Sequence, residues 1–153
     1  MAELFDIISD RLTDDTEAGG VNEPIEGAIG GFHRGKAPEG SRFPRVHVSK
    51  VTGLPTYTAT DEYARRHFIQ FTVFAKDPIE TGIPDESDEP GGEKAARLSR
   101  RIQTLFLDAD EELDDPEFVY SRLDRELFSS TEVDSVGGGD IYSEGCVMEM
   151  WTA

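Results

Sequence analysis

The sequence contains a single cysteine, Cys146, among its 153 residues. One cysteine cannot form an internal disulfide or supply a cysteine-rich zinc site, so we expect it to pack as a small hydrophobic side chain. No apolar run approaches the roughly 18 residues that a membrane-spanning helix requires. The residues after Met1 show neither a basic leader nor an apolar cleavage region. We therefore expect a protein without a disulfide, a secretion signal or a membrane segment.

Basic side chains are also scarce, because 15 Lys and Arg stand against 32 Asp and Glu, which gives a formal net charge of -17. Such a charge makes free duplex DNA an unfavourable ligand. It also destabilises a compact fold in dilute buffer, although the Debye length falls to roughly 3 Å at about 1 M salt. Two interpretations stay open: a protein of a salt-adapted cytoplasm, or an acidic mesophilic protein that its charge keeps soluble.

The length is that of one domain, so we take residues 1–153 as a single unit with its own core. An amphipathic helix is predicted over residues 2–12, because four apolar residues share one helical face: Leu4, Phe5, Ile8 and Leu12. The stretch that follows, to residue 42, is rich in Gly and Pro and predicts a loop with a short strand near Ile29. Val46 and Val48 alternate with polar residues and predict a strand.

The clearest alternation of the chain runs from Arg66 to Ala75 and predicts a long strand. Four of its residues are predicted to face the core: Ile69, Phe71, Val73 and Ala75. Phe68 and Phe74 make the opposite face unusually apolar. We expect both rings to be covered, either by another segment of the chain or by a neighbouring subunit.

A second amphipathic helix is predicted over residues 93–107, after a Pro- and Asp-rich surface loop at residues 77–92. Its polar face carries the only concentrated basic stripe of the sequence: Arg97, Arg100 and Arg101. These arginines either pair with nearby carboxylates, at about 0.3 to 1 kcal/mol for an exposed pair, or contact an acidic patch of another copy. Two closing strands are predicted over residues 119–127 and 141–151, with the triglycine at 137–139 as a hairpin turn.

The sequence shows no catalytic or metal-binding motif. His33, His47 and His67 are far apart in the chain and lack metal-ligand spacing. The acidic stretch 108–113 lacks the glycine and glutamate that an EF-hand loop requires. No serine lies in a Gly-x-Ser-x-Gly context, and no Lys-Ser or Lys-Thr follows the triglycine. We expect no enzyme activity, no cofactor and no metal, and keep as rivals a cation-dependent hydrolase and a monomeric regulatory binding module.

The order of these elements, with Ala37-Pro38 and then Phe43-Pro44 before a strand, resembles the tail terminator, or tail completion, family of long-tailed viruses. The resemblance covers nearly the whole chain, most clearly residues 37–48, 65–75 and 93–106. It implies an α+β fold with helices packed on one side of a mainly antiparallel sheet. It also implies a six-membered homo-oligomeric ring that caps the tail tube, stops its growth and joins the tail to the neck.

The resemblance further implies a virion protein at the tail-neck junction, assembled in the host cytoplasm. Its partners would be further copies of itself, a tail tube protein and a neck or head-completion protein, with genomic DNA passing through the channel without sequence-specific binding. The candidate subunit-interface residues are Phe68, Phe74, Arg97, Arg100 and Arg101. The loop 77–92 and the extreme charge depart from the family pattern, and both fit a virus of a halophilic archaeon. Another neck or tail-tube component is the alternative within this class.

Overall fold

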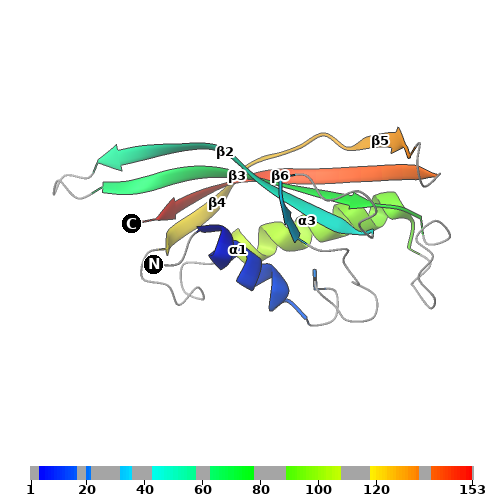
Figure 1. The fold of residues 1–153 in the computed structure, drawn as a ribbon, viewed down its shortest axis with the longest axis horizontal. Coiled ribbons are helices and arrows are strands. Elements are labelled where there is room, and N and C mark those ends of the chain that lie inside the picture. Colours follow the sequence, from blue (N-terminus) through cyan, green and yellow to red (C-terminus); the bar gives the residue numbers. More distant parts are fainter. Residues whose placement is uncertain are drawn as a thin grey trace.

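The computed structural model describes residues 4–16, 20–21, 32–35, 43–57, 63–77, 89–107, 118–134 and 139–152. Two helices in these ranges, α1 (Leu4–Thr13) and α3 (Gly91–Leu107), lie on the same side of a six-stranded sheet (Figure 1). The strands are β1 (Phe32–Arg34), β2 (Arg45–Tyr57), β3 (Tyr63–Ala75), β4 (Phe118–Glu126), β5 (Ser130–Val133) and β6 (Asp140–Thr152). The predicted α+β fold with helices on one side is confirmed.

The sheet has the order β1-β2-β3-β6-β4, and β5 also pairs with β6. Only β1 and β2 are parallel, so the sheet is mainly antiparallel, as expected. β4 and β5 follow one another along the same edge of β6, where the Leu127 N–H donates to the Gly145 carbonyl at 2.9 Å. The predicted strand near Ile29 lies outside the described residues. β1, which begins at Phe32, was not predicted.

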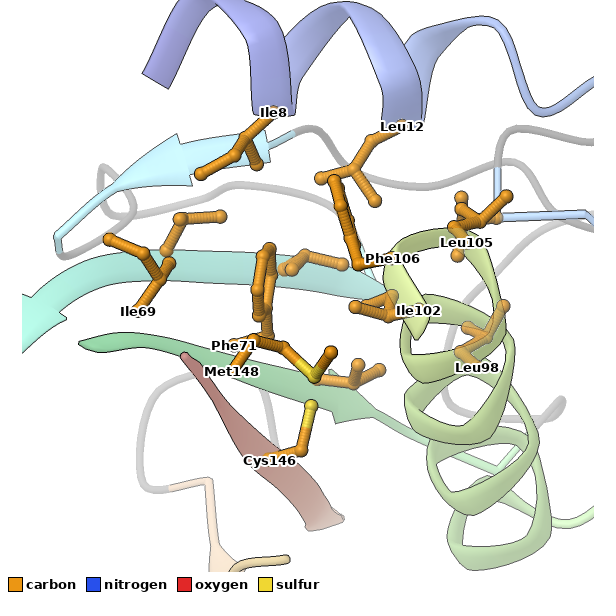
Figure 2. Packing of buried hydrophobic residues seen from close by; sticks show 14 of the residues in the cluster. Ile8, Leu12, Ile69, Phe71, Leu98, Ile102, Leu105, Phe106, Cys146 and Met148 are labelled. Carbon is orange, nitrogen blue, oxygen red and sulfur yellow. The ribbon is translucent and has the colours of Figure 1, made fainter. Parts of the chain in front are cut away.

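The core lies between the sheet and the two helices. The four β3 residues predicted to face it, Ile69, Phe71, Val73 and Ala75, all have 0% exposure. Figure 2 shows Ile102 and Phe106 of α3 beside Phe71 of the sheet, with Ile8 and Leu12 of α1 closing the cluster on the same side of the sheet. At its centre the rings of Phe71 and Phe106 stack at a centroid distance of 5.4 Å. Both predicted amphipathic helices are therefore confirmed as core elements.

Cys146 lies in this core at 0% exposure, as expected for a small hydrophobic residue. Burial raises the pKa of its thiol to about 12. The side chain is therefore a neutral thiol across the physiological range and has little nucleophilic character.

The start of α3 is fixed to the end of β3. The Gly91 N–H donates to the Asp77 carboxylate at 2.8 Å, which satisfies one of the free donors of a helix N-terminus. Glu93 in the first turn is favoured by the helix dipole. A Cβ atom at residue 91 would lie 2.6 Å from the carbonyl carbon of Lys76, so only glycine allows this close approach. The helix is thus tied to the strand on which it packs.

Several sequence predictions fall outside the described residues. They are most of the loop 77–92, the acidic stretch 108–113 and most of the triglycine turn. The strands predicted over 119–127 and 141–151 correspond to β4 and β6. Neither helix in the described part of the chain is long and apolar enough to cross a membrane.

Candidate functional site

The sheet face that points away from α1 and α3 is covered by no helix among the described residues, and we call it the open face (Figure 1). The strand register places Phe68 and Phe74 of β3 on this face, because their neighbours Ile69 and Val73 point into the core. His47 of β2 and Trp151 of β6 lie on the same side. The open face is therefore built from aromatic and polar side chains of three strands.

An arginine-aromatic network covers one end of the open face. The Arg66 guanidinium lies 5.4 Å from the centroid of the Phe68 ring and 5.9 Å from that of Trp151. The indole N–H of Trp151 donates to Glu149 Oε1 at 3.0 Å, and Arg122 Nε donates to Glu149 Oε2 at 2.8 Å. Both carboxylate oxygens are satisfied, which offsets the cost of burying Glu149 to 2% exposure. The network therefore joins side chains of β3, β4 and β6.

Phe68 and Phe74 are each half-buried. Phe74 packs on the His47 ring at a centroid distance of 4.6 Å. The described part of the chain thus supplies only partial cover for the two rings. Their predicted place in a subunit interface stays a prediction.

The basic stripe of α3 makes ion pairs within the chain. Arg97 Nε lies 3.1 Å from Glu89 Oε2, and Arg101 binds the Asp15 carboxylate with Nε at 2.9 Å and Nη2 at 2.6 Å. These contacts favour pairing with nearby carboxylates for Arg97 and Arg101. Arg100 is exposed. Of the three arginines, Arg100 is therefore the one best placed to contact another molecule.

The Asp15 carboxylate is a buried anchor between α1 and α3. It is 6% exposed and also accepts the Val21 N–H at 2.8 Å. Burial alone raises its pKa, but the hydrogen bonds from Arg101 and Val21, together with the charges of Arg101 and Arg11, hold the pKa below its ordinary value. The carboxylate is thus ionised at neutral pH. The spacing of residues in the sequence did not indicate the pair of Asp15 and Arg101, because 86 residues separate them.

Two hollows among the described residues are lined by both polar and apolar side chains. One, of about 210 Å³, lies between α1, β1 and β2 and is lined by Phe5, Leu12 and Arg34 among others. It is smaller than the roughly 300 Å³ at which ligand pockets of drug size begin. The other, of about 170 Å³, has Glu126 and Glu144 in its walls between α3 and the β4–β5 edge.

The histidines that are far apart in the sequence are not all far apart in space. β1 pairs with β2 so that His33 lies opposite His47, with ring centroids 6.2 Å apart. The prediction missed this approach because it missed β1. No group of three or more His, Cys, Asp or Glu side chains that could hold a metal ion occurs within the described ranges. In this part of the chain the pair is therefore not accompanied by the further ligands that a zinc site requires.

Comparisons with known proteins identify a fold but no family. No family model matches the chain, and no curated protein matches its sequence. A chain in the structure described as "Virion of native gene transfer agent (GTA) particle" is similar, with a TM-score of 0.53 and 13% sequence identity. The similarity covers 95% of this chain and 90% of that chain. Over nearly its full length, the protein therefore shares its fold with a chain of a gene transfer agent virion.

Proposed function

We propose that the protein is a structural virion protein that forms a ring, with six subunits expected, at the end of a tail tube. The ring stops tube growth and joins the tail to the neck, and genomic DNA passes through its channel. The observation that supports this proposal most is the fold shared with a virion chain over 95% of the present chain. The order of elements that resembles the tail terminator family supports it independently.

The surface of the subunit also fits a role in assembly. The helices close one face of the sheet, while the open face carries half-buried Phe68 and Phe74. Aromatic side chains of this kind are enriched where proteins contact one another. The scarcity of basic charge suits a channel through which DNA passes, because phosphate finds little to adhere to.

Two alternatives remain in different classes. Another neck or tail-tube component agrees with the same fold similarity. A cation-dependent hydrolase is less well supported, because Glu126 and Glu144 are the only carboxylates that line the hollow beside α3. We propose accordingly that the protein is not an enzyme, has no cofactor and resides at the tail-neck junction of the virion after assembly in the host cytoplasm.

Particles assembled without the protein are expected to contain filled heads and separate tails of uncontrolled length. The reason is that an uncapped tube end keeps adding subunits and lacks the surface that meets the neck. Electron micrographs measure tail length and attachment, and the protein supplied in trans should restore both. The variant Glu144→Gln should restore them equally well, since this carboxylate performs no chemistry. Normal tails on heads in its absence would exclude the terminator role.

Stability and assembly are expected to rise together from about 0.1 M to about 1 M sodium chloride, because the Debye length falls from about 10 Å to about 3 Å over this range. The net charge of -17 makes each subunit repel its neighbours at low salt. Thermal melting and native mass measurement at each salt concentration test this. A melting temperature that stays flat across the range would remove the argument for a salt-adapted host.

A further inference from the structure

The outer edge of β5 is uncovered. β5 pairs with β6 on one side, and no described strand pairs with it on the other. All four of its residues are exposed, Val133 at its end is 76% exposed, and Phe128 just before it is 100% exposed. An exposed edge with free backbone groups and apolar side chains is a template for pairing with another strand.

The opposite edge of the sheet is also largely uncovered. β1 pairs only with Val46–Val48 of β2, so β2 from Ser49 to Tyr57 has no strand on its outer side within the described ranges. Val51 on this stretch is 49% exposed. Four large hydrophobic side chains are exposed in the described part of the chain, and three of them lie on these two edges: Val51, Phe128 and Val133.

The directions of the strands allow the two edges to pair with each other. β2, β3, β6 and β5 alternate in direction across the sheet. A second copy whose β2 follows β5 continues this alternation as an ordinary antiparallel pair. Because β1 already pairs with the start of β2, the β5 edge can pair only with the later part of β2. The second copy is therefore displaced along the strand direction. Displacement of this kind is what closes a sheet into a barrel.

Charges on the two edges are complementary. Lys50 on β2 and Arg34 on β1 are exposed at one edge. Glu126 and Glu132 are exposed at the other. Opposite charges at a contact steer association and fix its register. If two copies instead met through their β5 edges, Glu132 of one copy would lie near Glu132 of the other.

We infer that the β5 edge of one subunit pairs with the free β2 edge of the next copy, extending the sheet from subunit to subunit. The contact is heterologous, since different surfaces of the same chain meet, and such contacts generate rings when the rotation closes. This inference rests on the proposed ring and names the surfaces that form it. The contact covers Val51, Phe128 and Val133, which otherwise remain in water.

Engineered cysteines test the contact. The protein with both Val51→Cys and Val133→Cys is expected to give a ladder of covalent oligomers after mild oxidation at molar salt, seen on a denaturing gel without reductant. Cys146 does not interfere, because it is buried and its pKa is raised to about 12. Each single variant should give no covalent product. A matched control, Val51→Cys with Leu107→Cys, uses another exposed residue away from both edges and should also give none.

A charge exchange tests the same contact without depending on cysteine geometry. Glu132→Lys should weaken association about tenfold. This loss is expected even though the substitution makes the net charge less negative and so reduces the general repulsion between subunits. Lys50→Glu in the same chain should restore the association. Association unchanged by Glu132→Lys, or covalent dimers from Val133→Cys alone, would overturn the edge pairing. A wild-type protein that is monomeric at molar salt would overturn it as well. If the ladder forms but particles without the protein have normal tails, the edge contact stands and the terminator role fails.

Discussion

Replacing Phe106 by alanine is expected to cost about 3 to 5 kcal/mol in the free energy of unfolding. Its ring has 0% exposure and stacks on Phe71 in the hydrophobic cluster that joins α3 to the sheet and to α1 (Figure 2). Truncation removes this stack and leaves a cavity that the surrounding helix and strands fill only in part. Because small domains have a total stability of about 5 to 15 kcal/mol, the loss is a large share of the whole.

Urea unfolding of dilute protein at fixed salt measures this change, since dilution keeps association from adding to the apparent stability. The matched control is Phe128→Ala, the same substitution at a residue with 100% exposure. It should change the free energy of unfolding by no more than about 0.5 kcal/mol. Equal effects of the two substitutions would contradict the packing of α3 on the sheet.

Asp15→Asn is expected to cost about 2 to 3 kcal/mol at neutral pH. Removing one partner of a buried ion pair costs about 3 to 5 kcal/mol, and we expect less here because Arg101 retains 26% exposure and reaches water. The asparagine also weakens the bond to the Val21 N–H, since an amide oxygen carries less charge than a carboxylate. Unfolding at pH 7 measures the cost. Asp14→Asn, at the neighbouring exposed carboxylate, should have little effect.

The pH dependence of this effect has a definite sign. The pKa of Asp15 is lowered in the folded protein, so its stabilising contribution is complete above the unfolded value of 3.8 and is lost as the pH falls through the folded pKa. The difference in stability between the wild type and Asp15→Asn should therefore stay constant down to about pH 4 and shrink below it. A difference that disappears between pH 5 and pH 6 would show that the carboxyl pKa is raised instead.

Local periodicity predicted the elements that form the core. In β3 the alternation of Ile69, Phe71 and Val73 was strong enough to assign the buried face correctly. In α3 the spacing of Leu98, Ile102 and Phe106 did the same. A three-residue strand such as β1 is too short to show alternation, so both it and the approach of His33 to His47 were missed.

The polar features of the candidate site depend on contacts that sequence spacing does not contain. Glu149, between two methionines in β6, carries no mark of burial in the sequence. It is buried because Arg122 from β4 and Trp151 both reach its carboxylate. Likewise, the exposure of Val133 follows from the place of β5 at the edge of the sheet. An alternating strand at an edge and one in the middle look alike in sequence.

The contact between Gly91 and the end of β3 limits how α3 can vary. Because a Cβ atom at residue 91 would lie 2.6 Å from the carbonyl carbon of Lys76, a larger side chain there would have to push the start of the helix away from the strand. The same shift would lengthen the hydrogen bond from the Gly91 N–H to the Asp77 carboxylate. The tilt of the helix over the sheet is therefore coupled to one small residue in its first turn.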